Sequence, residues 1–133
     1  MLDPMCGSGT FLVEGALMAA DIAPGLGRDH FGFQRWPTFE APVWRGLLDE
    51  AEERRADGLR RLPPFFGLDV ERRAVNTGRA NARRAGLAGR VVFEQRDLGS
   101  LSVPREAGQA GLVVTNPPYG KRLGDFADLV PLY

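Results

Sequence analysis

Asp3-Pro4-Met5-Cys6-Gly7-Ser8-Gly9-Thr10 is the stretch that decides the fold, because it leads directly into a run of apolar residues, 11–20. Apolar side chains stand nearly all round that run, which predicts a helix buried against a sheet, with Thr10 as its N-cap. Gly7 and Gly9 let the backbone turn tightly and approach a ligand, directly before the free N–H groups of a helix N-terminus. We therefore expect a strand end, a ligand-binding glycine loop over residues 3–10, and a helix.

Sequence motifs that are missing from this loop exclude several classes of ligand. A phosphate-binding loop of the Walker A type requires Gly-Lys-Ser/Thr, and no lysine stands here. The dinucleotide fingerprint G-x-G-x-x-G fails at its third glycine, where the chain has Leu12. Asp3 is unsuited to a diphosphate but could accept hydrogen bonds from the ammonium of an amino-acid moiety, which S-adenosylmethionine carries. The alternative is a structural strand-to-helix turn without a ligand.

Residues 22–42 are predicted to form an irregular aromatic loop, because prolines and glycines interrupt any regular element. The loop contains four large aromatic side chains, Phe31, Phe33, Trp36 and Phe39. These rings could stack on bases, but aromatic residues in a long loop more often pin it to the domain, and we favour that interpretation. The pattern from 43 to 61 then predicts an inserted helix with a charge-balanced, solvated face.

Two later strands are predicted, and an aspartate follows the apolar core of each. Residues 65–70 indicate a buried strand with Asp69 near its carboxyl end, and residues 90–95 indicate another, followed by Asp97. Ligands of open α/β sheets bind at the carboxyl ends of strands, so Asp69 could hold both ribose hydroxyls and Asp97 an adenine amino group. The alternatives are a helix-capping role for Asp69 and a turn-forming role for Asp97.

A helix over residues 71–86 connects these two strands, with small residues that let it lie close to the sheet. Residues 71–97 contain seven arginines against three acids, which is the only basic concentration in the chain. This surface could attract RNA phosphates, although a solvated helix face is the interpretation that we favour.

A fourth, buried strand is expected over 112–114, ending at Asn116-Pro117-Pro118-Tyr119, because neither proline can donate a ladder hydrogen bond. The side-chain carbonyl of Asn116 and the backbone carbonyl of Pro117 could accept hydrogen bonds from an NH2 group. Tyr119 could stack on the plane of the molecule that bears this group. This motif therefore suits a planar amine substrate, and the alternative is a proline-rich turn.

The composition excludes several classes of protein. The net charge is zero, and no apolar stretch approaches the length of a membrane span. The N-terminus shows no secretory signal, so a cytoplasmic setting is expected. Cys6 is the only cysteine, which excludes an internal disulfide and a cysteine-clustered metal site.

With these motifs in place, the chain resembles the class I S-adenosylmethionine-dependent methyltransferases. Within that group it is similar to the THUMP-associated 23S ribosomal RNA guanine-N2 methyltransferases. Three stretches carry the resemblance: 3–10, 31–36 and 116–124. The resemblance spans essentially the whole chain and implies a Rossmann-like parallel α/β sheet.

The resemblance also implies roles for individual residues. The cofactor, S-adenosyl-L-methionine, would be bound by Asp3, Pro4, Gly7, Ser8, Gly9, Thr10, Asp69 and Asp97. The target guanine would be held by Asn116, Pro117, Pro118 and Tyr119, with its exocyclic N2 amine facing the methyl group. No metal and no covalent nucleophile is required for this reaction.

Similar proteins have a full first strand, further strands after the Asn-Pro-Pro-Tyr helix and an upstream RNA-binding THUMP domain. We therefore expect residues 1–133 to be a partial catalytic domain, from the end of the first strand to the helix after the fourth, with no THUMP domain. The last strand would form an open sheet edge, which a missing domain or partner chain could complete. Two alternative functions stay open: an amino-directed methyltransferase acting on DNA adenine or protein glutamine, and a non-catalytic cofactor-binding fragment.

Overall fold

The computed structural model describes residues 1–101 and 110–117, and the chain divides into two compact units. The sheet unit comprises residues 1–14 and the chain from residue 64 onward, and the helical unit comprises residues 15–63. The elements of the sheet unit are β1 (Leu2–Asp3), β2 (Phe65–Asp69), α3 (Arg72–Arg84), β3 (Val91–Gln95) and the 3-10 helix η2 (Leu98–Ser100). The helix α1 (Thr10–Ala19) begins in the sheet unit, and the helical unit also holds η1 (Gly32–Arg35) and α2 (Ala41–Arg61).

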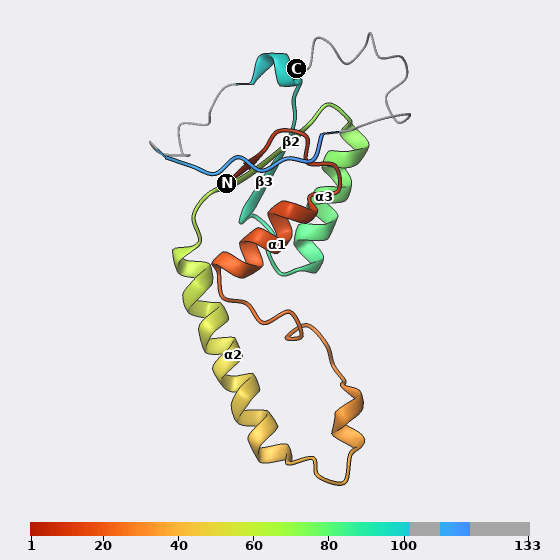
Figure 1. Cartoon of the computed structure of the whole chain (residues 1–133), viewed down its shortest axis with the longest axis vertical. Helices are drawn as coiled ribbons and strands as arrows, with labels where there is room; N and C mark the ends of the chain where they lie inside the picture. The colour runs from red at the N-terminus through yellow and green to blue at the C-terminus, as the bar shows by residue number, and fades with distance from the viewer. Residues whose placement is uncertain (102–109, 118–133) are drawn as a thin grey trace. The chain divides into compact units, whose positions relative to one another are not determined.

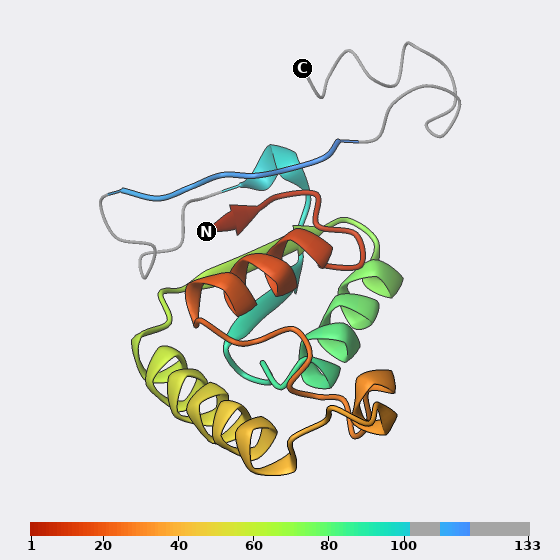
Figure 2. The same cartoon turned by 60° about the horizontal axis from the view of Figure 1, so that its bottom comes forward.

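The sheet consists of parallel strands in the order β1-β2-β3, with α3 packed beside β2 and β3 (Figure 1). Asp3 is paired with Gly67, and Asp69 with Gln95. The chain near residue 113 runs parallel to β1 on the side away from β2, as Figure 2 shows. Two backbone hydrogen bonds hold it there, at 2.8 and 3.0 Å on either side of Leu2. The parallel α/β fold predicted from the sequence is confirmed, and β1 lies between two neighbours.

The segment 112–114 differs from the buried strand that the sequence predicts. It pairs with β1 through a single bridge between Leu2 and Val113. Leu112 is 60% exposed and Val113 is 61% exposed. The prediction of burial is therefore wrong for the described residues. This segment is the outermost one on the β1 side of the sheet, and no described element covers its side chains.

The core of the sheet unit is organised around Phe93, which is 3% exposed. A Cβ atom built on Gly9, Gly67 or Gly78 would come within 2.8 Å of the Phe93 ring. A Cβ on Gly67 would also lie 2.4 Å from Cδ1 of Leu12. In a dinucleotide fingerprint the third glycine lets the helix pack closely on the strand. Here Leu12 stands at that position, and Gly67 on the strand leaves the space for its side chain.

The helix α1 is less completely buried than its sequence predicts. Leu12 and Ala16 are fully buried, but Phe11 is 42% exposed and Met18 is 81% exposed. The helix begins at Thr10, and the carbonyl of Gly9 accepts the first helical hydrogen bond at 2.9 Å. Gly9 therefore occupies the N-cap position that the sequence assigned to Thr10.

In the helical unit, α2 begins two residues before the predicted start and ends where predicted. Gly58 is its one buried residue, and a Cβ there would lie 1.7 Å from the carbonyl oxygen of Ala20. The helix therefore passes the end of α1 at backbone contact. In the described part of the chain, no helix is long and apolar enough to cross a membrane.

Candidate active site

The predicted site residues follow four parallel segments at one edge of the sheet. Asp3 ends β1, Asp69 ends β2, and Asp97 follows β3. Asn116 and Pro117 follow the segment bridged to β1. Because all these segments are parallel, their carboxyl ends meet at the same edge, where open α/β sheets bind ligands. Pro118 and Tyr119 lie outside the described residues.

The glycine loop is held in a conformation that favours glycine at two positions. Gly7 has a φ of 53° and Gly9 a φ of 76°, both in the left-handed region. The Gly9 N–H donates to the Cys6 carbonyl at 2.8 Å, and the Cys6 N–H donates to the Leu68 carbonyl at 2.8 Å. A Cβ on Gly7 would have no atom within 4 Å. The loop is thus fixed to β2 on one side and opens to free space at Gly7.

The remaining loop residues differ in accessibility. Pro4 is buried, whereas Ser8 and Thr10 are exposed. The hydroxyls of Ser8 and Thr10 lie 3.2 Å apart, with Ser8 two residues before Thr10, the first residue of α1. These two hydroxyls are therefore available to a ligand at the helix N-terminus.

Asp69 connects the glycine loop to the end of β2. Its Oδ2 accepts the Gly7 N–H at 2.8 Å, and its Oδ1 accepts the Glu71 N–H at 2.9 Å. The side chain is half-buried, and each ionised oxygen has a second lone pair that can accept from a ligand hydroxyl. The N-cap residue of α3 is Glu71, so Asp69 does not occupy the capping position considered from the sequence. Its hydrogen bond from the Glu71 N–H closes a turn just before the helix.

Asp3 is the one buried carboxylate among the predicted ligands, with 2% of its surface exposed. It accepts the Met5 N–H at 3.2 Å and a hydrogen bond from the Thr115 side chain. Burial raises the pKa of Asp3, the nearby Asp69 carboxylate raises it further, and the two hydrogen bonds oppose that rise. In the described structure Asp3 ties the start of the loop to the segment before Asn116, and its contact with a ligand ammonium stays a prediction.

Asp97 is exposed and begins the short helix η2. Its Oδ1 accepts the Gly99 N–H at 2.7 Å, so the turn-forming role considered from the sequence is present. The interaction of this carboxylate with an adenine amino group stays a prediction, for which Oδ2 would be the acceptor.

Asn116 is exposed and Pro117 is half-buried. Both follow Thr115, whose side chain is hydrogen-bonded to Asp3. This contact places the start of the predicted substrate motif next to the start of the glycine loop. The two motifs, which stand at opposite ends of the sequence, therefore adjoin in the sheet unit.

Two positioning contacts could not be found from the sequence. Asn81 of α3 donates from Nδ2 to the Ser8 carbonyl at 2.8 Å, and Thr115 is bonded to Asp3. The helix has two asparagines, Asn76 and Asn81, and no sequence signal distinguishes the one that makes the first contact.

Cys6 is buried inside the loop and is not part of a disulfide. Burial raises the pKa of this thiol to about 12, and the nearby carboxylates of Asp69 and Asp3 contribute to the rise. A thiol in this environment stays protonated near neutral pH and is a poor nucleophile.

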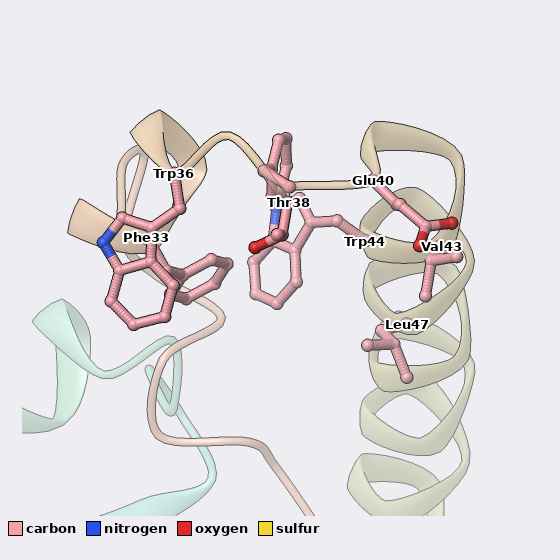
Figure 3. Close-up of a pocket in the computed structure, with 8 residues that line it drawn as sticks. Phe33, Trp36, Thr38, Glu40, Val43, Trp44 and Leu47 are labelled. Atoms are coloured by element: carbon pink, nitrogen blue, oxygen red, sulfur yellow. The ribbon is translucent and has the colours of Figure 1, made fainter.

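The aromatic loop packs on α2 within the helical unit. Trp44 of α2 makes edge contacts with the rings of Phe31 and Phe33, at centroid distances of 5.3 and 5.1 Å. These contacts support the interpretation that the aromatic residues pin the loop. Trp36, however, is 66% exposed, and Figure 3 shows it beside Phe33 at a hollow of about 320 Å³ that Val43 and Leu47 of α2 also line.

The comparison with protein families gives a match over the whole chain. A family model described as "RMKL-like, methyltransferase domain" matches residues 1–133. Two curated relatives are named ribosomal RNA large subunit methyltransferase K/L: one from Methylococcus capsulatus, 52% identical over the chain, and one from Allochromatium vinosum, 53% identical. Each alignment covers 100% of this chain but only 18% of the relative, so the chain spans about a fifth of the length of the relatives it matches.

Solved structures show the same fold. The protein SMU.472, solved in complex with SAH, is 34% identical with a TM-score of 0.79, over 98% of this chain and 36% of that one. A predicted N6-adenine-specific DNA methylase from Listeria monocytogenes is 35% identical with a TM-score of 0.81, over 98% of this chain and 33% of that one.

Proposed function

Because the chain belongs to the RMKL-like methyltransferase domain family, we propose that it carries out S-adenosylmethionine-dependent methyl transfer to the N2 amine of a guanine in large-subunit ribosomal RNA. The observation that carries the proposal is the adjacency of the glycine loop and the Asn116 motif at the carboxyl ends of neighbouring parallel segments, fixed by the backbone hydrogen bonds of Leu2 to Leu112 and Val114. The relatives named ribosomal RNA large subunit methyltransferase K/L support ribosomal RNA as the substrate, rather than DNA adenine or protein glutamine.

The described residues fit S-adenosylmethionine. Space is open above Gly7, and the adjoining Asp69 carboxylate has free lone pairs for the two hydroxyls of a ribose. Asp97 offers a second, exposed carboxylate for the adenine amine. A similar protein, SMU.472, was solved with SAH, the species that S-adenosylmethionine becomes after it gives up its methyl group.

In the proposed mechanism the chain acts by positioning the two reactants. When bound, the cofactor supplies an electrophilic methyl group on a positively charged sulfur. Asn116 and the Pro117 carbonyl accept the two N–H bonds of the guanine amine, which directs the nitrogen lone pair toward the methyl carbon. Transfer would form a bond from the nitrogen to that carbon as the carbon–sulfur bond breaks, with the amine losing a proton to solvent. Tyr119, which lies outside the described residues, would stack on the base once the base is taken out of its RNA helix.

The proposal extends to the setting of the reaction. We expect the chain to act on RNA in the cytoplasm as one catalytic segment, with cofactor loop 3–10, aromatic loop 22–42, inserted helix 43–61 and substrate motif 116–119.

The first experiment is isothermal titration of the chain with S-adenosylmethionine. Replacing Asp69 by asparagine should weaken binding roughly 10- to 100-fold, because a charge-assisted hydrogen bond to ribose is lost. Asp57→Asn, on the exposed surface of α2, is the matched control and should leave the affinity unchanged. A folded chain that binds no S-adenosylmethionine would overturn the proposal.

The second experiment measures methyl transfer from labelled cofactor to 23S ribosomal RNA that lacks its modifications. N2-methylguanosine should be the product, and Asn116→Ala should abolish it while cofactor binding persists. A product on DNA adenine or on a protein glutamine, with none on RNA, would mean that the substrate assignment is wrong.

A further inference from the structure

The helix α3 carries an unbalanced positive charge. Its sequence has five arginines and no acidic residue: Arg72, Arg73, Arg79, Arg83 and Arg84. All five are exposed. None of them forms an ion pair with any acid in the part of the chain that the structure describes. The nearest acid in sequence is Glu71, the N-cap residue, and it forms no ion pair with these arginines. Positive charges that lack ion-pair partners can bind a polyanion.

Arg72, Arg73 and Arg84 lie along one exposed face of α3, whereas Arg79 donates from Nη2 to the Phe93 carbonyl at 2.6 Å. The opposite face, with Val75, Gly78 and Ala82, is buried against the sheet. The exposed face forms a hollow of about 560 Å³, lined by Arg72, Arg73, Asn76, Thr77, Ala80, Asn81 and Arg84. Twelve residue steps separate its ends, which is about 18 Å of helix, enough to contact several phosphates of one strand.

The face is also attached to the candidate active site. Arg84 donates a hydrogen bond to Oδ1 of Asn81, and the same Asn81 side chain donates to the Ser8 carbonyl in the glycine loop at 2.8 Å. At its other end, α3 begins just after Asp69. A strand bound along this helix would therefore run beside the loop and the sheet edge where the proposed reaction takes place.

The position of two of the arginines opposes helix stability. Arg72 and Arg73 lie in the first turn of α3, where the helix dipole disfavours positive charge. An anionic ligand at this end would be stabilised both by the dipole and by the two guanidinium groups. The stability of the helix therefore does not account for these charges, whereas an anionic ligand does.

We propose that this face of α3, the α3 basic face, binds the phosphate groups of the RNA substrate. The identity of the strand as RNA rests on the proposed function. The phosphate contacts rest on the charge and geometry of the helix alone.

Binding of a labelled single-stranded RNA oligonucleotide, measured at several salt concentrations without cofactor, tests the proposal. The Arg72→Gln/Arg73→Gln variant should bind roughly tenfold more weakly at low salt, and its slope of log affinity against log salt should fall by about 1.4. The matched control is Arg55→Gln/Arg60→Gln on α2, which removes the same charge from arginines paired with Glu52 and Asp57. It should change the affinity less than about twofold, and Arg72→Lys/Arg73→Lys should retain most of the slope.

Three results would overturn the α3 basic face. If both double variants weaken RNA binding equally, the net charge of the chain would account for the binding, and the position of the arginines would not. The α3 variant could bind as the unaltered chain does. Poly-L-glutamate could compete as strongly as RNA, which would indicate an acidic protein as partner.

Titration with S-adenosylmethionine distinguishes these results from failure of the proposed function. The α3 variant should retain cofactor binding. RNA binding through α3 by a chain that shows no methyl transfer would refute the proposed reaction and leave the phosphate contacts standing.

Discussion

The helices α2 and α3 carry five arginines each but use them differently. The arginines of α2 are accompanied by five acidic residues, and three of them form ion pairs. Arg54, for example, contacts Asp21 at 2.9 Å and Glu50 at 3.2 Å. Those of α3 have no acidic neighbour on their own helix. The number of arginines in a helix therefore does not indicate how many are free to bind an anion. Acidic residues three or four positions away determine which arginines are ion-paired.

The two helices also differ in how they are packed. Three residues of α3 are buried against the sheet, while α2 has a single buried position, Gly58. We therefore expect α3 to be sensitive to added volume at its buried face and α2 to be sensitive at one position only.

Gly58→Ala tests whether α2 is held at one point. The added methyl would lie 1.7 Å from the Ala20 carbonyl oxygen, so backbone must move, and we expect a loss of at least about 3 kcal/mol of unfolding free energy. Gly46→Ala on the same helix is the control. It has no atom within 4 Å and should stabilise by about 0.5–1 kcal/mol through helix propensity. Urea unfolding measures both, and equal effects would contradict the single-contact description.

A buried titratable group in the sheet unit should make stability depend on pH, in contrast to the exposed ion pairs of α2. The pKa of Cys6 is raised to about 12 in the folded chain, so between pH 9 and 12 the unfolded thiol binds fewer protons than the folded one. Stability should therefore fall as pH rises, by about 2 kcal/mol from about pH 9 to about pH 11.

Urea unfolding of the chain and of Cys6→Ala at both pH values isolates this contribution. The alanine variant should lack that part of the decline. An identical decline in both would show that the thiol is ionised as easily in the folded chain as in the unfolded one.

Gly78→Ala tests the packing of α3. The new methyl would lie 2.6 Å from the ring of Phe93, which is a buried side chain. We expect a loss of about 1–2 kcal/mol, smaller than at Gly58 because a ring can shift where backbone cannot. A gain in the thermal midpoint, as expected for Gly46→Ala, would mean that α3 packs no more tightly than α2.

Single arginine substitutions give the smallest effects, and the two helices should differ in sign. Arg72→Gln should stabilise the chain by a few tenths of a kcal/mol, because it removes a positive charge from a helix N-terminus. Arg54→Gln should lower the thermal midpoint slightly, since it loses exposed ion pairs, and the decrease should vanish at high salt. A decrease in the midpoint for Arg72→Gln would show that this charge serves stability.

Much of the fold followed from local patterns. The strands around Phe65 and Phe93 and the helix between them were predicted to within a few residues, because apolar runs ending at glycine, proline or aspartate mark these elements. The parallel arrangement then placed Asp69 and Asp97 at one edge without any knowledge of contacts.

The remaining features depend on tertiary contacts that no local pattern encodes. The bond between Asn81 and Ser8 joins residues far apart in sequence, as does that between Thr115 and Asp3. The exposure of Val113 depends on which elements cover the sheet edge, and its apolar character alone predicted the opposite. The N-cap role of Gly9 likewise depends on a single-residue shift of a helix start, which sequence patterns do not resolve.

The ring of Phe93, in contact with the sites of Gly9, Gly67 and Gly78, has a consequence for how related sequences can diverge. A larger residue at Gly78 requires a smaller one at position 93, because every close contact of a Cβ there is with the Phe93 ring. Gly9 is held to glycine by its φ as well, and Gly67 by Leu12, so positions 78 and 93 should covary across the family while 9 and 67 stay glycine. Divergence elsewhere in α3 is free of that constraint.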